Sequence, residues 1–170
     1  YPSMDYLERA YDDAAYGGFS KRPYMDIEIP TINDPSMAPP GKHVMSIFVQ
    51  YANYDLAPFE TREAQTEAFG DAVIDTLADF APNIKDIILH KQVPTPWDIE
   101  QRVGLTEGNI FQGELTLDQL FFFRPAPGWA DYRTPIRNYY QCGSGTHPGG
   151  GITSGPGRLG ALEILRDGHL

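Results

Sequence analysis

The stretch that decides the fold is YYQCGSGTHPGGGITSGPGRLGALEIL, residues 139–165, close to the end of the chain. Its first residues predict a strand, its centre a glycine-rich turn and its last part a helix. Such turns bind phosphates or cofactors, because missing side chains let the backbone approach a ligand and the helix N-terminus carries a positive dipole. They usually begin a nucleotide-binding unit, whereas this one comes late. The turn is therefore either structural or half of a site whose other elements lie elsewhere.

Length and charge narrow the class of protein. The chain has 170 residues and a mass of 19.0 kDa, which predicts one domain or a piece of a larger one. No apolar run approaches the roughly 20 residues of a membrane-spanning helix. The formal net charge is -10, from 23 acidic and 13 basic residues. Because this charge repels phosphate backbones, we expect no nucleic-acid partner.

The ends and the cysteine content indicate the compartment. Cys142 is the single cysteine, which excludes an intramolecular disulfide and fits a reducing environment. The chain opens with YPSMDYLERAYDD, without an initiator Met or a secretory signal. We therefore expect a fragment of an intracellular protein, cytoplasmic or of the mitochondrial-matrix kind.

Hydrophobic periodicity predicts that helices and strands alternate over the first hundred residues. One helix is expected to stop at Gly17 and Gly18, and another carries an apolar stripe with Phe69, Val73 and Leu77 at its centre, flanked by Ala64 and Phe80. Thr95, Pro96 and Asp98 have the spacing of a helix start with a capping box. The expected helices span 4–16, 61–80 and the residues after Thr95, and the expected strands span 23–30, 44–54 and 84–93.

From Leu105 onward the sequence is rich in aromatic and loop-forming residues, and it shows little of the apolar period of a helix or of a strand. Two interpretations of its rings stay open: a buried cluster that packs loops, or the wall of a cavity for a flat or apolar ligand. The rings belong to Phe111, Phe121, Phe122, Phe123, Trp129 and Tyr132.

Few residues are candidates for direct chemistry. His147 lies inside the glycine-rich turn and is a weak candidate for catalysis, since a lone histidine is more often structural. The other histidines lack metal-ligand spacing, so no metal site is predicted. The frame around Ser144 is not that of a nucleophile elbow, and no Gly-Lys-Ser/Thr follows GTHPGGG as in a Walker loop.

The segments TEGNIFQGELTLDQLFFFRPAPGW, residues 106–129, and DYRTPIRNYYQCGSGTHPGGGITSGPGRLGA, residues 131–161, resemble the C-terminal end of the phytoene desaturase-like FAD-dependent oxidoreductases. The likeness extends upstream over nearly the whole chain. In that family the flavin domain is split: an N-terminal G-x-G-x-x-G turn holds the FAD diphosphate, a substrate domain is inserted, and the last strand and helix return to complete the site. No G-x-G-x-x-G turn precedes the substrate-domain segment, which is the largest departure from the family pattern; the one run with this glycine spacing, GPGRLG at residues 155–160, lies in the returning segment.

The resemblance implies an α+β fold. Residues 1–104 would belong to a substrate-binding domain with a mixed β-sheet and flanking helices, and residues 105–137 would form an aromatic connection. Residues 138–170 would be the strand-turn-helix that returns to the Rossmann-like FAD-binding domain. The residues implied to lie at the cofactor are Gly143, Ser144, Gly145, His147, Gly150, Gly151, Ile152 and Thr153. Gln112 stands where relatives often have His.

The leading hypothesis is a C-terminal fragment of an FAD-dependent oxidoreductase, a dehydrogenase, desaturase or isomerase-like enzyme that acts on an apolar or conjugated small molecule. The parent protein would bind FAD, and this chain alone would bind it weakly or not at all, because the diphosphate-binding half is missing. A non-catalytic binding or subunit-interaction module is the alternative. Apolar surface left by a split domain would also favour a homo-oligomer.

Overall fold

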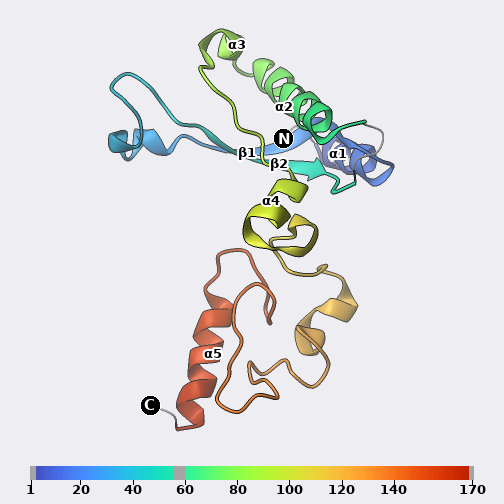
Figure 1. The fold of residues 1–170 in the computed structure, drawn as a ribbon, viewed down its shortest axis with the longest axis vertical. Coiled ribbons are helices and arrows are strands. Elements are labelled where there is room, and N and C mark those ends of the chain that lie inside the picture. Colours follow the sequence, from blue (N-terminus) through green and yellow to red (C-terminus); the bar gives the residue numbers. More distant parts are fainter. Residues whose placement is uncertain (1–2, 56–59, 169–170) are drawn as a thin grey trace. The chain divides into compact units, whose positions relative to one another are not determined.

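The computed structural model describes residues 3–55 and 60–168. The chain divides into two compact units, residues 1–98 and 99–170 (Figure 1). Helices and a small antiparallel sheet make up the first unit, and loops, short 3-10 helices and one longer helix make up the second. The predicted α+β class is confirmed.

The sheet of the first unit has two strands, β1 (Phe19–Glu28) and β2 (Ser46–Ala52). They pair antiparallel in register from Glu28 opposite Ser46 to Tyr24 opposite Gln50, and the register shifts between Tyr24 and Phe19, which lies opposite Ala52. The strands predicted at 23–30 and 44–54 are thus confirmed, although β1 begins four residues earlier than expected. The connection carries two 3-10 helices, η1 (Pro30–Ile32) and η2 (Pro35–Met37), and extends past the end of the sheet (Figure 1).

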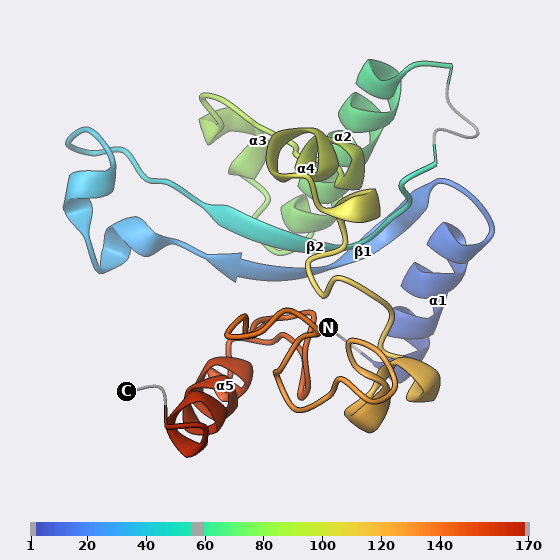
Figure 2. The ribbon, with the colours of Figure 1, turned by 60° about the horizontal axis from the view of Figure 1, so that its bottom comes forward.

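Two helices pack against this sheet, α1 (Met4–Ala15) and α2 (Arg62–Ala78) (Figure 2). Each begins at a hydroxyl side chain: Ser3 Oγ accepts from the Tyr6 amide at 3.3 Å and Thr61 Oγ1 from the Ala64 amide at 3.2 Å. Gly17 and Gly18 follow α1 with φ of 111° and 104°, which ends the helix where the sequence predicts. Both predicted helices are confirmed.

The core of the first unit lies between these helices and the sheet. Phe19 of β1 and Phe69 of α2 pack with their ring centroids 5.1 Å apart and their planes tilted by 52°. Ser20 is fully buried, and its Oγ accepts from the Tyr51 amide at 2.8 Å while it donates to the Ala10 carbonyl. Ala64 and Phe80, expected on the buried stripe of α2, are exposed instead. The buried apolar residues are Ala10, Ala14, Phe69, Val73, Leu77 and Ile84.

The strand predicted at 84–93 is wrong. Ile84–Ile87 forms one helical turn, α3, and no strand is assigned from Ile88 to Val93. A run of β-branched residues becomes a strand only where another strand pairs with it, and β1 and β2 pair with each other. Ile84 is buried, whereas Ile87 and Leu89 face solvent.

Helix α4 (Pro96–Val103) begins as the sequence predicts. Asp98 Oδ2 accepts from the Thr95 amide at 2.8 Å, and Thr95 Oγ1 accepts from the Asp98 amide at 3.4 Å. These reciprocal bonds are a capping box, with Asp in the place of the usual Glu.

The described part of the second unit contains the larger part of α4, the longer helix α5 (Gly155–Arg166) and three 3-10 helices: η3 (Thr106–Gly108), η4 (Leu117–Gln119) and η5 (Phe121–Phe123). The helix predicted after the glycine-rich turn is therefore confirmed, and the aromatic segment is built from loops as its lack of period indicates.

The strand predicted just before the glycine-rich turn is wrong as well. Residues 137–142 hold a single antiparallel bridge, between Arg133 and Tyr140. The Gln141 amide donates to the Tyr132 carbonyl at 2.8 Å and the Thr134 amide to the Tyr139 carbonyl at 3.2 Å. The chain folds back on itself here, so the apolar and aromatic residues that suggested a strand form a tight hairpin instead.

Candidate functional site

The glycine-rich loop, residues 143–154, is shaped by two successive turns around Thr146. This threonine is buried, and both its amide and its Oγ1 donate to the Gly143 carbonyl, at 3.1 and 3.0 Å. Its own carbonyl accepts from the Gly149 amide at 2.6 Å. The first half of the loop therefore has a defined conformation held by local hydrogen bonds.

Arg124 fastens this half of the loop to the chain that precedes it. Its side chain is only 2% exposed. Nε and Nη2 donate to the Ser144 carbonyl at 3.0 and 2.7 Å, and the other guanidinium donors reach carbonyls of the segment 111–119. The sequence reasoning missed this residue, although a charged side chain inside the run FFFRPAP is a signal, because arginine is buried only where its donors are satisfied.

The glycines of the loop are of two kinds. A β-carbon at Gly145 would stand 2.9 Å from Gln112 Oε1, and one at Gly150 would stand 2.8 Å from Phe111 Cδ1, so these two glycines allow close packing inside the chain. Gly143 and Gly151 are exposed and have φ of 122° and 105°; a β-carbon would meet nothing within 4 Å at Gly143 and only Thr153 Cγ2, at 3.9 Å, at Gly151. Open space at a positive φ leaves the backbone accessible to a ligand.

The end of the loop exposes its backbone just before α5. Ile152 is fully exposed with φ of 57°, and Ser154, the N-cap of α5, has the same φ and makes no side-chain capping bond. Thr153 Oγ1 accepts from the Gly155 amide at 3.2 Å. The positive end of the helix dipole therefore faces a segment with little side-chain cover.

His147 lies beside an aromatic ring rather than in a polar cluster. Its ring centroid is 5.9 Å from that of Phe121, and its carbonyl accepts from the Tyr132 hydroxyl at 2.8 Å. Burial, and then the charge of Glu163, raise the pKa of Tyr132, so this hydroxyl stays protonated as the donor. The contact fixes the turn at His147, and a catalytic role for its imidazole stays a prediction.

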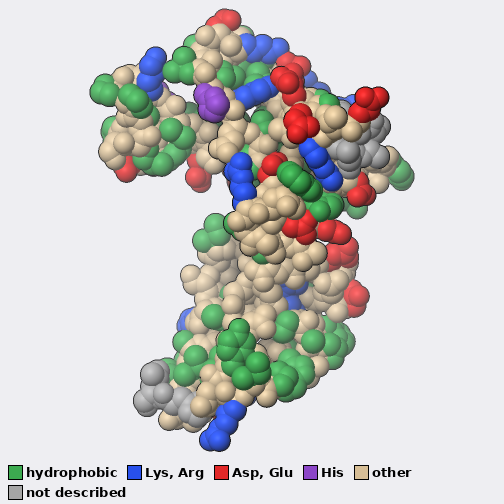
Figure 3. Space-filling view, in the orientation of Figure 1, with side chains coloured by type: hydrophobic (Ala, Val, Ile, Leu, Met, Phe, Trp, Pro, Cys, Tyr) green, Lys and Arg blue, Asp and Glu red, His purple; other side chains and the backbone are tan. Residues whose placement is uncertain are grey.

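Three consecutive phenylalanines continue from that ring along the surface. Neighbouring rings of Phe121, Phe122 and Phe123 lie 6.2 and 6.1 Å apart. All three are exposed, Phe122 by 75%. Figure 3 shows hydrophobic side chains gathered on the surface of the part of the chain that residues 99–168 form. Of the two interpretations of the aromatic residues, packing of loops fits the buried Tyr132, whereas these three rings are available to a ligand.

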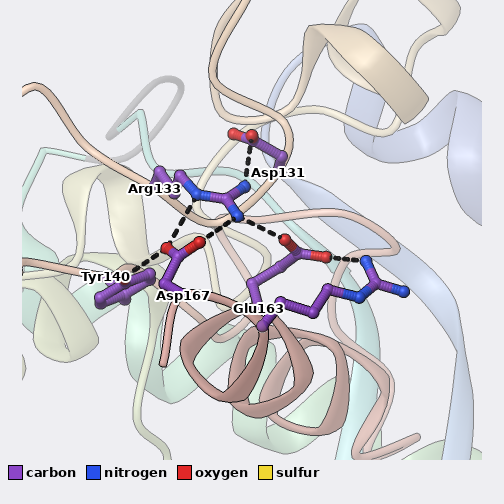
Figure 4. Close-up of polar contacts among 6 residues, drawn as sticks. Asp131, Arg133, Tyr140, Glu163 and Asp167 are labelled. Carbon is purple, nitrogen blue, oxygen red and sulfur yellow. Dashed lines mark hydrogen bonds and ion pairs between the residues drawn. The ribbon is translucent and has the colours of Figure 1, made fainter. Parts of the chain in front are cut away.

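A cluster of polar and charged side chains surrounds Arg133 (Figure 4). Its guanidinium pairs with Asp131 at 2.7 Å and with Glu163 and Asp167 of the α5 end, both at 2.8 Å. Tyr140 donates to Asp167 Oδ2 at 2.5 Å. The hydrogen bond with Asp167, then partial burial, raise the pKa of Tyr140, and the carboxylates raise that of Arg133. An open cavity of about 410 Å³ lies beside this cluster. It is lined by Arg133, Thr134, Ile136, Arg137, Asn138, Tyr139, Tyr140 and Asp167.

Backbone strain is concentrated in the same unit. Among residues 3–55 and 60–168, the non-glycine residues with positive φ all lie between Glu107 and Ser154. Strained backbone of this kind clusters at functional sites, where the surrounding structure maintains it. The positions are Glu107, Gln112, Phe121, Tyr132, Asn138, Ile152 and Ser154.

The described part of the chain contains no group of three or more His, Cys, Asp or Glu side chains that could hold a metal ion. None of its helices combines the length and the apolar character needed to cross a membrane.

In sequence, the chain resembles the phytoene desaturase-like oxidoreductases. The particular protein it resembles is pyridine nucleotide-disulfide oxidoreductase domain-containing protein 2: the Rattus norvegicus protein is 43% identical over 162 residues, which cover 95% of this chain and 28% of that relative. No protein-family model matches the sequence.

Other relatives share less sequence. Phytoene desaturase (lycopene-forming) of Paracoccus sp. is 29% identical over 135 residues, 79% of this chain and 25% of that protein. Phytoene desaturase (neurosporene-forming) of Cereibacter sphaeroides is 28% identical over 149 residues, 88% of this chain and 27% of the relative. The chain therefore spans about a quarter of the length of these relatives.

Proposed function

We propose that this chain is part of an FAD-dependent oxidoreductase that acts on an apolar or conjugated small molecule. The similarity that extends over 95% of the chain to a protein named for an oxidoreductase domain carries this proposal. A bound flavin would supply the hydride acceptor, while the protein orients the substrate and excludes water. The relatives named as phytoene desaturases support the apolar substrate class.

We propose that three successive segments of the chain have different roles. Residues 1–104 belong to a substrate-binding domain, residues 105–137 connect it, and residues 138–170 are the segment that returns to a split FAD-binding domain. The diphosphate-binding half, with its G-x-G-x-x-G turn, lies in another part of the parent protein, and we propose that FAD binding requires it. This chain alone therefore binds FAD weakly or not at all.

The glycine-rich loop is the proposed flavin contact. Gly143 and Ser144 would lie along the ribityl and diphosphate portion, and Gly151, Ile152 and Thr153 would run past the flavin ring. Gly145 and Gly150 would support this contact from inside the chain, where they pack against Gln112 and Phe111. The exposure of Gly143 and Gly151 supports this assignment, since a ligand can approach the backbone at both. The start of α5 adds a positive dipole that favours negative charge on the reduced ring.

The aromatic surface is the proposed contact for the substrate. Phe121 stacks near His147, and Phe122 and Phe123 extend the apolar surface away from the loop. Burial of such rings by an apolar ligand releases free energy of roughly 25 cal/mol for each Å² removed from water. His147 shapes the turn on this side.

The test is flavin analysis of the complete polypeptide that contains this chain. After purification, the bound cofactor is released by denaturation, identified and compared with the protein concentration. We expect about one FAD per chain, and none with the isolated 170-residue chain titrated with FAD under the same conditions. A complete protein that purifies without flavin, and does not bind FAD on titration, would contradict the proposal and favour a non-catalytic interaction module.

A further inference from the structure

The buried guanidinium of Arg124 donates hydrogen bonds to backbone carbonyls from all three of its nitrogen atoms. Nε and Nη2 donate to Ser144, Nη1 donates to Glu114 at 3.3 Å and to Gln119 at 3.2 Å, and Nη2 also donates to Phe111. Among the residues that the structure describes, no carboxylate forms an ion pair with it. A buried charge that relies on carbonyl oxygens alone depends on every one of them.

These carbonyls come from two segments that are far apart along the chain. Ser144 lies 20 residues from Arg124 and is the second residue of the glycine-rich loop, whereas the other three acceptors belong to the segment 111–119. Arg124 therefore joins the loop to that segment. Lysine could not do the same, because its single nitrogen lacks the planar fork that reaches several acceptors in different directions.

The joined segment also supplies the packing surface of the loop. Phe111 fits against Gly150 and Gln112 against Gly145, and the Arg124 Nε atom stands 3.7 Å from where a β-carbon of Gly149 would be. One side of the loop is thus held from Gly145 to Gly150. The residues that follow, Gly151 and Ile152, are exposed.

We propose that Arg124 is a positioning residue for flavin binding: by fastening Ser144 to the segment 111–119, it holds the loop in the conformation that presents Gly151 to Thr153 to the cofactor. The inference rests on the proposed function for the identity of the ligand. Arg124 itself contacts no cofactor in this assignment, since its donors are used by the carbonyls.

The test compares Arg124→Lys and Arg124→Met with Val73→Ala in the complete polypeptide. Val73 is a buried residue of α2 in the other unit, so Val73→Ala lowers stability without touching the loop. We expect both Arg124 variants to bind FAD about ten- to a hundredfold more weakly, from the 1.5–3 kcal/mol of charged hydrogen bonds at 1.4 kcal/mol per tenfold. Val73→Ala should retain the wild-type dissociation constant for FAD, although its melting temperature falls by an amount comparable to that of the Arg124 variants.

A second measurement does not depend on flavin. Amide hydrogen exchange at Thr146 and Gly149, whose amides close the two turns, should accelerate in flavin-free Arg124→Lys, while exchange in α2 stays unchanged. Wild-type FAD affinity in Arg124→Lys, or unchanged exchange at both amides, overturns the proposal. If the wild-type protein binds no FAD, the proposed function fails instead, and the exchange data still report whether Arg124 holds the loop.

Discussion

Gly150 and Phe111 are packed so closely that the glycine has no room for a side chain: a β-carbon there would lie 2.8 Å from Cδ1 and 3.1 Å from Cε1 of the ring. Both residues belong to the second unit, 39 positions apart along the chain. The contact explains the middle glycine of the GGG run by internal packing, independently of any ligand.

This packing predicts the effect of Gly150→Ala. Overpacking of a well-filled site costs about 1–3 kcal/mol. Since 1 kcal/mol corresponds to roughly 2–4 °C in a domain of this size, thermal unfolding should show a clear loss. Gly157→Ala in α5 is the matched control, because a β-carbon there meets nothing within 4 Å. It should be neutral or slightly stabilising, since alanine favours the helix. Equal melting temperatures for the two variants would argue against the contact.

Gly151→Ala should act on the cofactor instead. Its φ of 105° is strained for alanine, and the resulting shift of the loop costs on the order of 1–3 kcal/mol. In the complete protein, FAD affinity should fall roughly five- to a hundredfold. Gly128→Ala is the control: it has a φ of 82° and open surroundings but lies outside the loop. Flavin content and melting temperature are measured together for both. Full flavin retention in Gly151→Ala alongside a lowered melting temperature would reject the proposed contact.

The hydrogen bond from Tyr140 to Asp167 predicts a pH dependence. It raises the pKa of Tyr140 above the ordinary 10.0, so the protonated phenol is favoured in the folded chain. Its contribution to stability is therefore fully present below about pH 10 and is lost as the pH rises through the raised pKa. Nuclear magnetic resonance of the Tyr140 ring, assigned with Tyr140→Phe, measures the titration. Asp167→Asn should bring the pKa of Tyr140 back down, and an unchanged pKa would contradict the assignment.

Phe122→Ser should separate ligand binding from stability. Because the Phe122 ring is already largely exposed, its removal should change the melting temperature little. Binding of an apolar substrate by the complete protein should weaken, since the ring no longer covers apolar surface. Tyr16→Ser, at an exposed aromatic residue in the first unit, should leave binding unchanged. Binding of an apolar ligand that is equal in both variants would remove Phe122 from the proposed site.

The sequence predicts the elements that local rules determine. The starts of α1, α2 and α4 follow from hydroxyl caps, and the end of α1 follows from Gly17 and Gly18. The failures at 84–93 and 137–142 share one cause. β-propensity describes a residue's fit to a pleated surface, whereas a strand also needs a partner, and the partner is set by the tertiary fold.

The same division holds for the candidate site. Spacing points to the glycine-rich loop, but it does not distinguish Gly150, which packs on Phe111, from Gly151, which is exposed. Arg124 escapes sequence reasoning because its acceptors are main-chain carbonyls, and these have no residue-specific signature. Hydrogen bonds from side chain to backbone over 20 positions become visible only in three dimensions.

The strained residues of the second unit have a consequence for protein engineering. Ile152 is a β-branched residue held at φ of 57° with its side chain fully in water, so it adds to the cost of the backbone conformation and gains little from burial. Glycine adopts this conformation freely. Selection for thermal stability alone would therefore replace Ile152 by glycine. The loop backbone would keep its conformation, and the isoleucine side chain would be removed. A substitution at position 152 can therefore raise thermal stability and at the same time remove any contact that the isoleucine side chain makes with a ligand.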